Sequence, residues 1–153
     1  MKVPLTRLTL PLAALAVVAV LATFLVVALR FNSLPETIPV HFGLGGAPDG
    51  WSSRRDIWEL PVVSLMLLVI QLGAALLAIR LGPRQHPKTV ELTAMFASWC
   101  AVVFLVLAWR AIEVAVGHAE SLGWYTIAVI FVPLIGLIIR SLQVKRISVS
   151  REN

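Results

Sequence analysis

Four long stretches without a charged side chain constrain this sequence more than any other feature. They run over residues 8–29, 60–79, 92–109 and 122–139, and apolar residues dominate each of them. About 18 or more such residues form a helix long enough to cross a hydrocarbon core of about 30 Å. Each stretch has to be helical, because backbone groups find no water partners inside lipid. The sequence therefore predicts an all-α integral membrane protein, a bundle of four transmembrane helices that forms a single membrane domain over 1–153.

The segments between these stretches are short, and their lengths exclude a separate soluble domain. The longest is the loop at 30–59, which is shorter than the roughly 40 residues that a domain needs to fold unaided. A cleaved signal peptide is not favoured, because the first apolar run ends at Leu29-Arg30-Phe31 rather than at a small-x-small cleavage site. The one cysteine, Cys100, lies inside the third stretch, so no disulfide framework or thiolate metal cluster is expected.

The net charge of +5 is distributed unevenly along the chain, which indicates a membrane orientation rather than a nucleic-acid partner. Basic residues exceed acidic ones in the N-terminus, the 80–91 loop and the tail from Arg140, whereas acidic residues exceed basic ones across 30–59 and 110–121. Short basic loops stay on the cytoplasmic side. We therefore expect both termini to be cytoplasmic and the 30–59 loop to lie outside. The aromatic residues at the outer span ends agree, since such rings prefer the headgroup layer: Trp58, Trp109, Trp124 and Tyr125.

Polar residues are scarce inside the predicted spans. None of the four stretches contains Asp, Glu, Lys, Arg or His, the residues that mark ion paths or catalysis at membrane depth. Gln71, near the middle of the second span, is expected to hydrogen-bond a neighbouring helix, and the alternative is that it lines a ligand path. Small residues three or four positions apart favour close helix contacts: Ala13, Ala16, Ala19, Ala22, Ala74, Ala78, Ala97 and Ala101.

Two further features concern the third and fourth spans. Pro133 lies in the middle of the fourth span and is expected to kink it. The third helix is expected either to end at residue 109 or to continue to Val116. In the longer form Arg110 and Glu113 stand three residues apart on one face and are expected to pair.

The 30–59 loop has the composition of a structured hairpin, rich in proline and glycine. Ile38–Phe42 reads as a short extended segment, and Ala47–Gly50 reads as a tight turn. We expect a small hairpin that lies against the outer ends of the helices.

The same loop carries a recognisable motif, Leu34-Pro35-Glu36-Thr37-Ile38-Pro39-Val40-His41-Phe42 followed by Gly46-Ala47-Pro48-Asp49-Gly50-Trp51. It resembles the bacterial membrane family called domain of unknown function 1648, the N-terminal module of SdpI-like immunity and signalling proteins. The resemblance implies a multi-pass protein of the bacterial inner (cytoplasmic) membrane. Some relatives protect their producer against a secreted toxin and relay its presence to a membrane-sequestered regulator. The motif residues singled out by the resemblance are Pro35, Ile38, Pro39, His41, Phe42, Gly46, Asp49 and Trp51.

His41 is the candidate site residue with the most alternatives. A structural role, in which it hydrogen-bonds the turn, competes with metal binding, a proton-sensitive switch and recognition of a partner. The weak metal candidates are His41, Asp49 and His118, with Glu36 and Glu120 as neighbouring acids. No pair of them has zinc-motif spacing. Asp49 is expected to bond its own backbone as a turn residue ahead of Gly50.

These observations favour a non-enzymatic membrane protein without a cofactor. We expect sensing, immunity or interaction through the outer loop, with an extracellular peptide or another membrane protein as partner besides the lipid bilayer, and no nucleic acid. The alternative is a small transporter or an accessory subunit of a membrane complex, in which Gln71 and the Pro133 kink shape a passage. An outer-face metal-dependent hydrolase ranks last, because no nucleophile and base stand at recognisable spacing.

Overall fold

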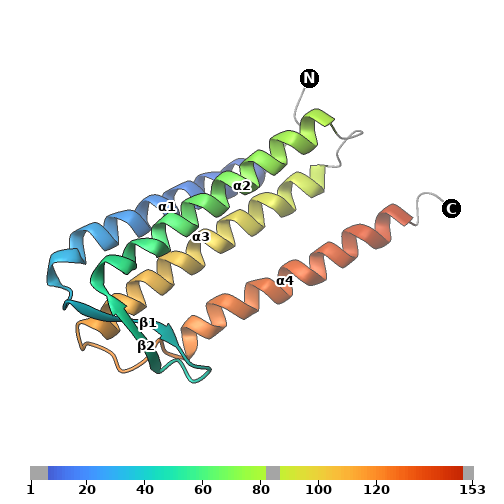
Figure 1. Cartoon of the computed structure of the whole chain (residues 1–153). Coiled ribbons are helices and arrows are strands. Elements are labelled where there is room, and N and C mark those ends of the chain that lie inside the picture. The colour runs from blue at the N-terminus through green and yellow to red at the C-terminus, as the bar shows by residue number, and fades with distance from the viewer. Residues whose placement is uncertain (1–6, 82–86, 150–153) are drawn as a thin grey trace.

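The computed structural model describes residues 7–81 and 87–149, and within them the four predicted spans are four long helices. The helices are α1 (Thr9–Arg30), α2 (Glu59–Leu81), α3 (Pro87–Ala115) and α4 (Trp124–Val149) (Figure 1). Each contains a window long and apolar enough to cross a bilayer. The prediction of a four-helix integral membrane protein is therefore confirmed, and α3 extends close to the longer of its two expected limits.

The connections at one end of the bundle carry all the remaining secondary structure of the described residues. A 3₁₀ turn, η1 (Phe31–Ser33), the strands β1 (Thr37–Phe42) and β2 (Pro48–Ser53), and a second 3₁₀ turn, η2 (Arg54–Trp58), join α1 to α2. The α3–α4 connection reaches the same end, which we call the hairpin end (Figure 1). The first turn of α1 and the last turns of α2 and α4 lie at the opposite end. The hairpin thus caps one end of the bundle.

The predicted hairpin is present, but its turn lies earlier than expected. The turn is built on 43–47, where Gly43 N donates to Ala47 O at 2.9 Å and Gly46 N donates to Gly43 O at 2.8 Å. Gly46 has a φ of +77°, which a residue without Cβ adopts at little cost. Pro48 to Gly50 belong to β2 instead of a turn, and Pro48 opens that strand, where a missing N–H is tolerated. The expected turn at Ala47–Gly50 is therefore wrong.

Inside the predicted membrane layer, α1, α2 and α3 meet through small side chains. A buried cluster joins alanines of α1 and α3 to Leu68 of α2: Ala16, Ala19, Val20, Leu68, Ala97 and Ala101. The Ser98 hydroxyl adds a hydrogen bond from α3 to Leu12 O of α1 at 2.6 Å. The expectation of close packing at small residues is confirmed for these alanines, whereas Ala74 is exposed.

Helix α4 lies beside α3 and is the least buried of the four (Figure 1). Hydrogen bonds and an ion pair join it to α3. Trp99 Nε1 donates to Val129 O at 3.2 Å, and Arg140 pairs with the buried Glu91 towards the opposite end. Pro133 is exposed on α4, away from the inter-helix core.

Candidate functional site

The hairpin is fixed to the bundle by a second apolar cluster, separate from the one in the middle of the helices. Leu34 and Ile38 are buried with Val27 of α1 and Ile112 of α3, and the same cluster contains Ile57, Ala108 and Ala111. Ile38 and the neighbouring Pro39 are fully buried. A two-stranded hairpin is only marginally stable alone in water, so this burial is what holds it in one orientation.

The tip of the hairpin is fixed separately to the α3–α4 connection. Leu122 N donates to Gly46 O at 2.9 Å. The same connection is held by Arg110 of α3, whose guanidinium donates to Leu122 O at 3.0 Å and to Ser121 O at 2.6 Å and lies 5.1 Å from the centroid of the Tyr125 ring. The expected Arg110–Glu113 pair is therefore wrong, because two backbone carbonyls accept from Arg110 instead.

His41 and Asp49 face each other across the hairpin. The Nδ1 atom of His41 is paired with the Asp49 carboxylate, and both side chains are largely exposed. Gly50 stands directly opposite His41 in the strand register. A Cβ atom on Gly50 would lie 2.8 Å from Cβ of His41, so only glycine permits this approach. Asp49 is thus a cross-strand partner, and the expectation that it bonds its own backbone in a turn is wrong.

A pocket of about 300 Å³ opens between the hairpin and the helix ends. Its walls come from β1, from the start of α2 and from α3, and they are mainly apolar. Three ionisable side chains, His41, Asp56 and Glu59, are also part of the lining. The Asp56 carboxylate accepts a hydrogen bond from the Ser52 hydroxyl of β2. The pocket therefore combines an apolar interior with acidic groups.

The exposed surface of the hairpin has both apolar and charged members. Leu44 at the tip is fully exposed, Trp51 is 61% exposed and Val40 is 46% exposed. Pro35 is exposed before β1, and Phe42 is half-buried in the pocket wall. We call Val40, His41, Leu44, Asp49 and Trp51 the hairpin face. Of the motif residues, Ile38, Pro39 and Gly46 are therefore buried anchors, whereas His41, Asp49 and Trp51 belong to this face.

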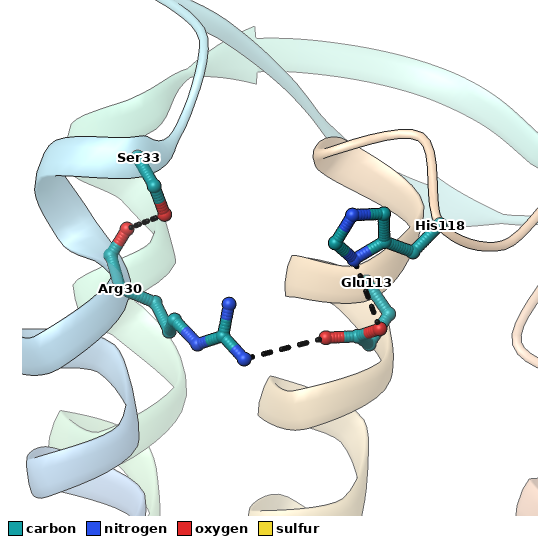
Figure 2. Close-up of polar contacts among 4 residues, drawn as sticks. All are labelled: Arg30, Ser33, Glu113 and His118. Atoms are coloured by element: carbon teal, nitrogen blue, oxygen red, sulfur yellow. Dashed lines mark hydrogen bonds and ion pairs between the residues drawn. The ribbon is translucent and has the colours of Figure 1, made fainter.

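A second polar cluster lies at the hairpin end and is not apparent from sequence spacing (Figure 2). Glu113 of α3 points between Arg30, at the end of α1, and His118, in the α3–α4 connection. Arg30 Nη2 lies 4.0 Å from Glu113 Oε1, and His118 Nδ1 lies 3.4 Å from Glu113 Oε2. Gly117, with a φ of +80°, ends α3 and allows His118 N to donate to Glu113 O at 2.9 Å.

The structure separates the metal candidates into different pairs. His41 binds Asp49, whereas His118 binds Glu113. Among residues 7–81 and 87–149, no three His, Cys, Asp or Glu side chains come together in a way that would hold a metal ion.

The side-chain amide of Gln71, on α2, lies near the Cys100 thiol of α3. Its Oε1 atom is buried and has no hydrogen-bond partner within the described chain. The expected hydrogen bond from Gln71 to a neighbouring helix therefore stays a prediction.

Comparison with known proteins points to the region around the hairpin. Residues 18–65 match the family model described as "Domain of unknown function (DUF1648)". They comprise the second half of α1, the whole hairpin and the first turns of α2. An uncharacterised protein of the archaeon Archaeoglobus fulgidus is 32% identical over 98 residues, which are 61% of this chain and 50% of that protein.

The matched region thus spans half the length of that relative. No solved structure matches the chain. Residues 18–65 of this multi-pass membrane protein are therefore similar to the DUF1648 domain.

Proposed function

We propose that this protein is a non-enzymatic recognition subunit of the cell membrane, which binds a polypeptide outside the cytoplasm through the hairpin face. The partner is an extracellular peptide or the outer part of another membrane protein. A role in sensing or immunity, of the kind implied by the resemblance to SdpI-like proteins, follows from such binding. The uneven distribution of basic residues supports the orientation, with both termini cytoplasmic and the hairpin outside.

One observation carries the proposal: the hairpin is anchored firmly at its base and tip while its face stays exposed. Ile38 is fully buried in the apolar cluster, and Gly46 O accepts from Leu122 N. A face held in one conformation loses little entropy on binding. Trp51 offers a large, exposed amphipathic surface. Tryptophan is enriched among the residues that contribute most of the binding energy at interfaces.

The side-chain pairings at the site also support a role without catalysis. Nδ1 of His41 is paired with Asp49, and the Ser52 hydroxyl donates to Asp56. The histidine and the serine therefore have separate partners, whereas nucleophilic catalysis requires the hydroxyl to donate to a base such as histidine.

Site-specific photo-crosslinking in living cells tests the proposal. A photoreactive amino acid at Leu44 is expected to form an adduct with one discrete polypeptide. Replacing Trp51 by alanine should reduce the yield of that adduct by about 30-fold if Trp51 is a central contact worth about 2 kcal/mol. The matched control is Trp109→Ala, because Trp109 is similarly exposed (50%) but lies on α3.

Two results would overturn the proposal. One is that the probe at Leu44 reacts only with lipid. The other is that Trp51→Ala and Trp109→Ala lower the adduct yield equally, which would remove the hairpin face from the contact.

A further inference from the structure

The root of the hairpin contains a second, strongly polar pocket of about 580 Å³. It lies where β1 begins and β2 passes into η2. We call it the arginine pocket, and its lining residues are Glu36, Thr37, Ser52, Ser53, Arg54 and Arg55. It shares none of them with the pocket beneath the hairpin face.

The two arginines of this pocket have no anionic partner within the described residues. The ion pairs of that part of the chain use other basic groups: Arg30, His41, His118 and Arg140. The Cζ atom of Arg54 lies 5.4 Å from the centroid of the Phe31 ring, a cation–π contact that positions the guanidinium. Arg55 is exposed at the pocket wall.

The arginine pocket also contains hydroxyl donors, and its basic side chains outnumber its acidic one. The Ser53 oxygen accepts from Arg55 N at 3.3 Å, which leaves its O–H free to donate to a ligand. Thr37 supplies a second hydroxyl. Glu36 is the one carboxylate in the lining, so two guanidinium groups face one acid.

Neighbouring aromatic rings indicate the depth of the arginine pocket in the membrane. The Trp58 ring lies 5.9 Å from the Phe31 ring and 6.4 Å from the Phe24 ring, centroid to centroid. Tryptophan prefers the headgroup layer at the end of a span. Because Arg54 lies over Phe31, its guanidinium is held at the same level, where lipid phosphates lie.

We propose that the arginine pocket binds a phosphate group at the membrane surface. The planar guanidinium fork matches the oxygens of a phosphate in two parallel hydrogen bonds, and the hydroxyls of Thr37 and Ser53 donate to the remaining oxygens. A phospholipid headgroup is the source closest to this position. A free phosphate anion carries the same chemistry.

Native mass spectrometry of the full chain in neutral detergent tests this site. The probes are phosphatidylglycerol and a diacylglycerol with the same acyl chains but no phosphate. We expect one tightly bound phosphatidylglycerol and much weaker binding of diacylglycerol. Each basic residue at a membrane surface contributes about 1 kcal/mol, so Arg55→Gln should weaken phosphatidylglycerol about fivefold and the Arg54→Gln/Arg55→Gln variant about 30-fold.

The matched control is Arg80→Gln, which removes an exposed arginine at the opposite end of α2 and should leave the affinity within about twofold. The Arg55 side chain makes no hydrogen bond, ion pair or ring contact within the described residues, so Arg55→Gln should leave the fold intact. Competition by inorganic phosphate identifies the source. If inorganic phosphate displaces phosphatidylglycerol and binds with the same affinity, the ligand is a free anion. If inorganic phosphate fails to displace phosphatidylglycerol, the ligand is a lipid headgroup. Equal binding of diacylglycerol, or an unchanged affinity in the double variant, would overturn the site.

Discussion

Replacing Gly50 by alanine tests whether the close approach of the two strands holds the hairpin in place. Gly50 stands opposite His41, and the added Cβ atom would lie 2.8 Å from Cβ of His41. Carbon atoms at optimal contact are about 3.5 to 4.0 Å apart. The strands must therefore separate by a substantial fraction of an ångström, which also pulls His41 away from Asp49.

The cost of such crowding in a packed structure is about 1 to 3 kcal/mol. It should appear as faster amide hydrogen exchange in the hairpin, since local opening needs that much less free energy. The expected acceleration for the amides of β1 and β2 is about 5-fold to 150-fold. The middle turns of α1 and α3, whose cluster does not include the hairpin, should exchange at unchanged rates.

Hydrogen exchange with mass spectrometry on the purified protein in detergent measures this effect. Gly45→Ala is the matched control, because nothing lies within 4 Å of the position its Cβ would take. The double variant His41→Gly/Gly50→Ala transposes the small residue across the strand pair and should restore slow exchange. Equal hydrogen exchange in Gly50→Ala and Gly45→Ala, or exchange in the transposed variant as fast as in Gly50→Ala, would refute a role for the close strand approach.

Three other substitutions have defined outcomes for the free energy of unfolding in detergent. Ile38→Ala should lower it by about 2 to 5 kcal/mol, because the side chain is fully buried at the hairpin base. Arg110→Gln should lower it by about 2 to 3 kcal/mol, since the hydrogen bonds to Ser121 O and Leu122 O are lost. Gln71→Leu should leave it within about 1 kcal/mol or raise it, because Oε1 is buried without a partner.

Denaturant titration followed by tryptophan fluorescence measures all three variants. A loss below about 1 kcal/mol for Ile38→Ala would mean that the hairpin is not anchored through its base. The free energy of unfolding of Arg110→Lys should lie between those of the wild type and Arg110→Gln. Equal free energies of unfolding for the two variants would contradict the role of the guanidinium fork. A loss above about 2 kcal/mol for Gln71→Leu would show that the amide is fully hydrogen-bonded.

The four spans could be predicted from sequence because their cause is local. A long uncharged run in lipid has only a helical solution, so the run itself marks the helix. The first and last residues of the helices were less predictable, because polar turns extend the helices beyond the apolar runs. Helix α3 begins at Pro87, where proline suits a first turn, and it ends just before Gly117, which adopts a positive φ.

The hairpin shows where local signals compete. Pro48-Asp49-Gly50 has the composition of a turn, yet Gly46 takes the positive φ and places the turn earlier. Once the turn moves, Asp49 lies in a strand and meets His41 across the pair. A local turn signal cannot decide this outcome, because strand register also depends on the buried side chain of Ile38.

The remaining contacts of the site join residues far apart in the chain. Arg30 and Glu113 meet only after α1 and α3 have packed side by side. Arg110 has backbone acceptors only because the α3–α4 connection folds back over it. The spacing along α3 predicted an Arg110–Glu113 pair. Arg110 instead donates to backbone carbonyls of the α3–α4 connection.

The proposed function requires that the hairpin end of the bundle lies outside the cell and the opposite end inside. Cysteine labelling with a membrane-impermeant maleimide tests it most directly, with Leu44→Cys at the exposed tip, Arg80→Cys near the end of α2, and Cys100 replaced by alanine in both. We expect intact cells to label position 44 at once and position 80 only after permeabilisation. Labelling of position 80 but not position 44 in intact cells would contradict the account.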